Sequence, residues 1–125
     1  MSVNISNFSG EQRQALLDLL VLGMYADRHL ALAEDARVHR LLTLMEISSG
    51  SERQRQFDGA VARVRLRAET PEAGAAQAVI LAQKFTTREL RNVACNLLEE
   101  LMGSDRKISP EEARFLSVVK DLLQT

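Results

Sequence analysis

The sequence is poor in the residues that build strands, disulfides and aromatic surfaces. It has no Trp, one Tyr, four Phe and a single cysteine, Cys95. A fold rich in β-strands would need more aromatic and β-branched side chains than this. One cysteine cannot form an internal disulfide, which favours a reducing compartment. These absences predict an all-α protein located in the cytoplasm.

An excess of charge of one sign and a long apolar run are also missing. The formal net charge is -1 over 125 residues, so we expect no general attraction to nucleic acid. The longest apolar stretch, from Ala15 to Ala26, contains Asp18. It is shorter than the roughly 20 residues that a membrane-spanning helix needs. The opening residues, MSVNISNFSG, lack the basic and apolar segments of a signal peptide. We therefore expect one domain over residues 1–125, without a transmembrane segment.

Hydrophobic residues make up 46% of the chain, and Leu and Ala, which favour helices, dominate among them. Capping patterns recur where apolar residues begin to repeat with helical spacing. They predict a compact bundle of about six helices joined by short turns. The expected helices are one opened by Ser9 with Gln12 and ending near Ala26, one over about 31–45, one opened by Ser51 with Gln54, one from Thr70 and Pro71 to about Phe85, one from Thr86 with Glu89 to Gly103, and one opened by Ser109 and Pro110.

The first and last helical pairs match each other. Each pair carries an aspartate, then an aliphatic residue three positions later and a glutamate four positions after that: Asp27, Leu30 and Glu34, then Asp105, Ile108 and Glu112. Apolar positions on both sides stay in register: Leu19 and Leu20 with Leu97 and Leu98, Met24 with Met102, Val38 with Leu116, and Leu41 with Val119. Agreement sustained over about thirty residues indicates a duplicated helix–acidic turn–helix hairpin.

The two turns resemble the signature of the TerB-like family, the tellurite resistance protein B and its relatives. That signature is a helix, an Ala-Asp-Gly-x-Ile turn, a polar cap and a glutamate that opens the next helix. This chain has it in segments 25–34 and 104–112, with Arg28 and Arg106 where the family has glycine. The resemblance implies an all-helical fold over the whole chain, no enzymatic activity and divalent-cation binding at the acidic positions. It also implies a role in stress-response complexes near the membrane, and hence peripheral membrane association.

The acidic residues of the two turns are the candidate metal ligands: Asp27, Glu34, Asp105 and Glu112. Ca²⁺ and Mg²⁺ take oxygen ligands, which a loop aspartate and a first-turn glutamate can supply. A structural explanation competes, because Glu112 occupies a capping-box position and acidic residues in a first turn favour the helix dipole. Ala31 replaces the capping serine in the first copy, so capping explains Glu34 less well. Neither turn has the spacing of an EF-hand.

Other reactive side chains offer little chemistry. His29 and His39 are not part of a His-Glu-x-x-His or Glu-x-x-His motif, so zinc-hydrolase and di-iron ligand sets are lacking. We expect His29 to be exposed. The sequence places no base beside Cys95, so we expect a packed thiol rather than a nucleophile. No catalytic or cofactor-binding residue is assigned.

The leading prediction is a non-enzymatic module that binds a partner protein, modulated by a divalent cation. One alternative is a metal-dependent hydrolase, which requires the four acidic residues to converge in one pocket. Another is a nucleic-acid binder that uses Arg63 and Arg67. The absence of aromatic stacking partners disfavours that alternative. We expect a mostly solvated surface at the arginines of the middle section: Arg53, Arg55, Arg63, Arg65 and Arg67.

Overall fold

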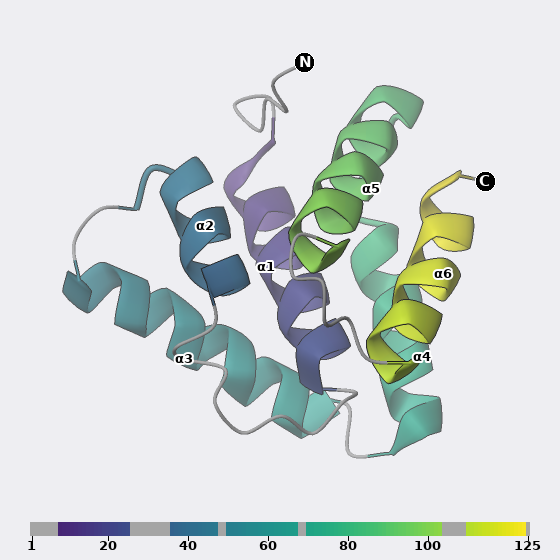
Figure 1. Cartoon of the computed structure of the whole chain (residues 1–125), viewed down its shortest axis with the longest axis horizontal. Coiled ribbons are helices and arrows are strands. Elements are labelled where there is room, and N and C mark those ends of the chain that lie inside the picture. Colours follow the sequence, from purple (N-terminus) through teal and green to yellow (C-terminus); the bar gives the residue numbers. More distant parts are fainter. Residues whose placement is uncertain (1–7, 26–35, 48–49, 68–69, 104–109, 125) are drawn as a thin grey trace.

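The computed structural model describes residues 8–25, 36–47, 50–67, 70–103 and 110–124, and all regular structure in these ranges is helical. Six helices follow one another along them: α1 (Gly10–Tyr25), α2 (Ala36–Leu44), α3 (Gly50–Arg67), α4 (Pro71–Ala82), α5 (Arg88–Gly103) and α6 (Pro110–Gln124) (Figure 1). The predicted all-α bundle is confirmed. None of these helices is both long and apolar enough to cross a bilayer.

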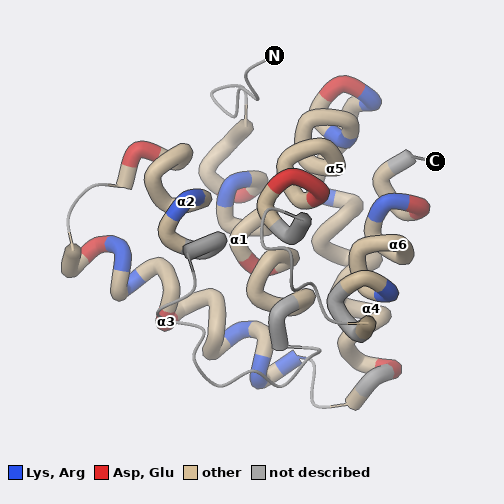
Figure 2. The backbone as a smooth tube through the Cα atoms, viewed as in Figure 1, with Lys and Arg blue, Asp and Glu red and all other residues tan. Residues whose placement is uncertain are grey.

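Helix α1 lies at the centre of the bundle. It contacts each of the other five helices, and these five contact one another in the cyclic order α2, α3, α4, α6, α5. The stretch 15–23 of α1 is buried on every side. A helix that is apolar all round belongs inside a core, so the sequence of α1 matches its position. Charged residues lie largely on the surrounding helices, and the arginines of α3 lie towards its two ends (Figure 2).

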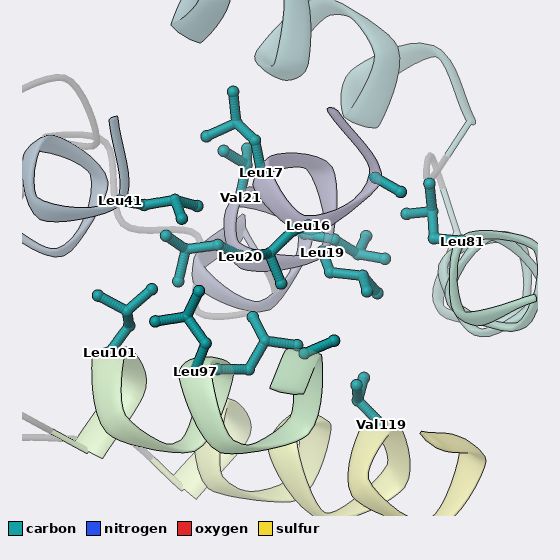
Figure 3. Close-up of a cluster of buried hydrophobic side chains, with 14 of the residues drawn as sticks. Leu16, Leu17, Leu19, Leu20, Val21, Leu41, Leu81, Leu97, Leu101 and Val119 are labelled. Carbon is teal, nitrogen blue, oxygen red and sulfur yellow. The ribbon is translucent and has the colours of Figure 1, made fainter. Parts of the chain in front are cut away.

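The core forms where the surrounding helices direct aliphatic side chains at α1. Figure 3 shows such residues from four helices: Leu41 of α2, Leu81 of α4, Leu97 and Leu101 of α5, and Val119 of α6. All five are less than 5% exposed, as are the leucines of α1 that they meet. Burying one leucine contributes about 1.5–3 kcal/mol, so the contacts around α1 supply much of the driving force for folding.

Two predicted helix starts are confirmed in atomic detail. The amide of Gln12 donates to Ser9 Oγ at 3.1 Å, and the amide of Ser9 donates to Gln12 Oε1 at 2.9 Å. This is the reciprocal capping box. Thr70 Oγ1 accepts from the amide of Ala73 at 3.0 Å, and Pro71 is the first residue of α4. Proline is tolerated there because the first helical amide has no partner within the helix.

The predicted capping box of Thr86 with Glu89 is wrong by one residue. The cap is Thr87, whose Oγ1 accepts from the amide of Leu90 at 3.1 Å, and α5 begins at Arg88. Helix α4 also ends earlier than predicted, at Ala82. The chain leaves the helix there because Phe85 turns into the core, where its ring centroid lies 5.2 Å from that of Phe8.

The third predicted start is also displaced. Helix α3 begins at Gly50, so Ser51 lies inside the helix and does not cap it. The side chain of Gln54 donates to Asp58 Oδ1 at 2.8 Å, along the helix rather than back to its start. The predicted end of the first helix at Ala26 and the predicted start of the second at Ala31 lie outside the described residues.

Candidate functional site

The acidic residues predicted as metal ligands lie mostly beyond the described ranges. Asp27, Glu34 and Asp105 are outside them, and Glu112 belongs to α6 without a described side chain. Among the side chains that the structure describes, no three His, Cys, Asp or Glu residues group together as ion ligands. Metal binding at the four predicted positions therefore stays a prediction. His29 is also outside the described residues.

Inside the core, α1 carries one charged residue, Asp18. Its carboxylate accepts two hydrogen bonds from Arg63 of α3, from Nε to Oδ2 and from Nη2 to Oδ1, both at 2.8 Å. The side chain of Asp18 is 4% exposed and that of Arg63 is 27% exposed. A planar guanidinium suits this paired geometry, which lysine cannot reproduce. Gly59 leaves room for it, because a Cβ there would lie 3.2 Å from Arg63 Nη1.

The pairing of Arg63 with Asp18 corrects the predicted solvated surface of the middle section at this arginine. Arg63 is not part of a solvated surface, because Asp18 binds it. Arg53 is also engaged, since its Nε donates to the carbonyl of Ile47 at 2.7 Å. Arg65 and Arg67 are exposed, as predicted. A nucleic-acid surface built on Arg63 would therefore first have to separate Arg63 from Asp18.

Helix α3 also places Arg55 in an ion pair with Glu52. A hydrogen bond from Gln56 to Glu52, together with the one from Arg55, lowers the pKa of the Glu52 carboxyl below its ordinary value. Arg55 is thus partnered within its own helix. These contacts engage Arg53, Arg55 and Arg63 of α3, and none of the three is among the residues that line the pocket at the ends of α4 and α6.

A pocket of about 440 Å³ lies where α4 and α6 end and α5 begins. It is lined by residues from three helices and the turn between α4 and α5: Val79, Ala82, Gln83, Phe85, Thr86, Arg91 and Leu122. Its volume is in the range of sites that accept a small molecule or a side chain. Arg91 is the one charged residue among its lining residues.

The turn that forms the pocket floor is held from two sides. Gln12 of α1 donates from Nε2 to the carbonyl of Lys84 at 3.0 Å. Arg91 of α5 donates from Nη1 to the carbonyl of Phe85 at 3.3 Å. Because Phe85 is also anchored against Phe8 in the core, the turn has little freedom to collapse into the pocket.

Exposed aliphatic side chains lie on the same two helices, α4 and α6, as the aliphatic residues of the pocket. Val79 and Ile80 of α4 are 38% and 50% exposed, and Val118 of α6 is 46% exposed. Val118 lies one helical turn before Leu122, on the same face of α6. We call these residues together the α4/α6 surface: Val79, Ile80, Phe85, Arg91, Val118 and Leu122.

Arg91 was not among the residues predicted from the sequence, although the repeat contained a signal for it. The repeat relates residues 78 positions apart, and on that spacing Ser9 corresponds to Thr87 and Arg13 to Arg91. Extending the match to the helix starts would have placed the cap of α5 at Thr87. Both arginines are half-buried, and Arg13 Nε is buried without a hydrogen-bond partner among the described residues.

Cys95 lies in α5 and is 3% exposed, which confirms the prediction of a packed thiol. No protein-family model, curated protein or solved structure matches the chain. The TerB-like resemblance therefore rests on the two turn motifs alone.

Proposed function

We propose that this chain is a non-enzymatic helical module of the TerB-like type that works in the cytoplasm by binding a partner protein at the α4/α6 surface. The observation that carries the proposal is the exposure of neighbouring aliphatic residues beside a pocket. Val79, Ile80 and Val118 are each more than a third exposed, next to the half-buried Leu122. Exposed apolar residues beside a pocket are typical of interaction sites.

The composition of the surface supports a protein partner. Interfaces combine an apolar centre with arginine and aromatic residues, which recur among the residues that dominate binding. The α4/α6 surface has aliphatic residues from two helices with Arg91 beside them, and Phe85 lines the pocket while being 1% exposed. A role in a stress response, of the kind the TerB-like motifs imply, is part of the same proposal.

Site-specific photo-crosslinking in the native cell tests this proposal. We expect a photoreactive phenylalanine analogue at position 118 to give a defined adduct of higher mass. The same analogue at position 96 is the control, since Asn96 is exposed on α5 away from the pocket residues. Equal labelling from both positions, or none from position 118, would contradict a docking site on the α4/α6 surface.

The duplicated acidic pattern supports a second element of the proposal, a divalent cation that modulates binding. Asp27 with Glu34 and Asp105 with Glu112 have the same spacing in both hairpins. Retention of both carboxylates, one of them without a capping serine beside it, favours a shared ligand role over two independent caps. Their oxygens suit Ca²⁺ or Mg²⁺.

Calorimetric titration with Ca²⁺, Mg²⁺, Mn²⁺ and Zn²⁺ tests the cation. We expect a saturable heat with Ca²⁺ or Mg²⁺ that is lost in the variant Asp27→Asn with Asp105→Asn. Asp121→Asn, an exposed carboxylate on α6, is the matched control and should bind as the wild type does. No heat and no thermal shift at millimolar ion would remove this element and leave protein binding unaffected.

A further inference from the structure

The guanidinium of Arg91 has no carboxylate partner among the described residues, unlike that of the half-buried Arg63. Arg63 pairs with Asp18, and Arg53 donates to backbone and hydroxyl oxygens. Arg91 makes one side-chain hydrogen bond, from Nη1 to the carbonyl of Phe85, and no described carboxylate pairs with it. Its Nε and Nη2 thus have donor capacity left beside the pocket.

The surroundings of Arg91 favour an anion over a cation. None of the residues that line the pocket is acidic. Arg88 lies one position after the cap of α5, is exposed and has no described carboxylate partner. Lys84 in the adjoining turn has only a 3.5 Å contact with Glu11, at a solvent-exposed site. The short stretch 84–91 therefore carries three positive side chains and one negative one, that of Glu89, for a formal net charge of +2.

The apolar residues of the pocket determine which other groups a ligand with an acidic group must carry. Val79, Ala82 and Leu122 form walls of the pocket, and Val118 extends that wall along α6. Residues 118 and 122 are separated by about 6 Å along the helix axis. A ligand that fills the surface therefore needs aliphatic groups spaced over about one helical turn, with an acidic group at the Arg91 end.

We propose that the α4/α6 surface recognises an acidic segment of the partner protein. A carboxylate of that segment pairs with Arg91, and an aliphatic side chain one turn away packs against Val79 and Leu122. The inference rests on the proposed function and names the chemistry of the partner. Arginine is well suited to the task because its planar fork matches a carboxylate at two atoms.

Selection of random twelve-residue peptides displayed on phage against the full chain tests the inference. We expect enriched peptides to carry Asp or Glu three or four positions from Leu, Ile or Val. The dissociation constant of a fluorescein-labelled winner is then measured by anisotropy. Arg91→Gln should weaken binding at least about tenfold, since hydrogen bonds to a charged group change affinities on that scale. Arg91→Lys, which keeps the charge, should retain part of the affinity.

The controls separate this inference from the proposed function. Arg67→Gln removes the same charge from an exposed position on α3 and should leave the affinity unchanged. If Val79→Ser with Val118→Ser weakens binding while Arg91→Gln does not, the surface binds proteins but acidic recognition is wrong. If no peptide is enriched, or none of these substitutions alters binding, both proposals fail. Displacement of the peptide by hexanoate at lower concentration than by unlabelled peptide would assign the pocket to a small carboxylate and overturn the inference.

Discussion

Helices α1 and α5 are the first helices of the two hairpins that match in sequence, and their burial differs along one face. Both begin at a hydroxyl cap, Ser9 or Thr87. Both direct a pair of buried leucines at the core: Leu19 and Leu20, then Leu97 and Leu98. The opposite faces of the two helices differ in burial. Val21 and Leu22 of α1 are buried, whereas the residues 78 positions later, Glu99 and Glu100, are exposed.

The difference follows from what lies between the two hairpins. Helices α3 and α4 occupy that part of the chain and pack on α1, which closes the ring around it. In the part of the chain that the structure describes, no helix covers Glu99 and Glu100 on the outer face of α5. The two hairpins thus share the pattern that faces the common core, and their other faces match different surroundings. Asp18 and Asn96 are an instructive pair, because Asp18 is buried against Arg63 and Asn96 is exposed.

The largest expected effect comes from replacing a residue of α1 with the residue that α5 has at the equivalent position. Val21→Glu would place a carboxylate at a position with no exposed surface. Burying an unpaired charge is among the most destabilising substitutions, and we expect a loss of more than about 4 kcal/mol. Since domains of this kind are stable by only about 5–15 kcal/mol, circular dichroism during urea unfolding should show a protein largely unfolded or close to it.

The reverse substitution is the control. Glu99→Val removes an exposed carboxylate that lies 3.5 Å from Lys120 Nζ. Exposed ion pairs contribute about 0–1 kcal/mol, so stability should change by no more than that. If the two substitutions had similar effects, α1 and α5 would not differ in burial and the ring of helices around α1 would be wrong.

A smaller effect is expected from replacing Asp18 of α1 with asparagine, the residue that α5 has at the equivalent position 96. Asp18→Asn leaves Arg63 without its carboxylate. Removing one partner of a buried pair costs about 3–5 kcal/mol. We expect about 2–3 kcal/mol here, because Arg63 is 27% exposed and asparagine keeps one acceptor. Denaturant unfolding of both Asp18→Asn and the exposed Asn96→Asp checks this, and the latter should change stability by less than about 0.5 kcal/mol.

A double substitution distinguishes the pair from the packing around it. Asp18→Leu with Arg63→Met replaces both charges with apolar groups, which is often neutral for buried pairs. We expect the double variant to be more stable than Asp18→Asn alone. A double variant that is less stable than Asp18→Asn would mean that the pair itself, and not the unpaired arginine, accounts for the effect.

Local patterns predicted the helices well, because caps and helical spacing act over a few residues. Ser9 with Gln12 and Thr70 with Pro71 are such signals, and both starts are confirmed. No local pattern in the sequence predicts contacts between segments that are distant along the chain. Asp18 and Arg63 are 45 residues apart in the chain, so helical spacing says nothing about their pairing. The pocket likewise needs α4, α5 and α6 together, and only the repeat pointed to Arg91.

The smallest expected effect concerns where the repeat begins in α5. If Thr87 corresponds to Ser9, then Thr87→Ala should remove the hydrogen bond from Thr87 Oγ1 to the amide of Leu90. Loss of a helix cap costs about 1 kcal/mol. Thr86→Ala is the matched control one residue earlier, and it should cost less because the hydroxyl of Thr86 does not cap α5. Urea midpoints of both variants measure the difference. A larger loss for Thr86→Ala would place the cap of α5 at Thr86, and the starts of α1 and α5 would then not follow the 78-residue spacing of the repeat.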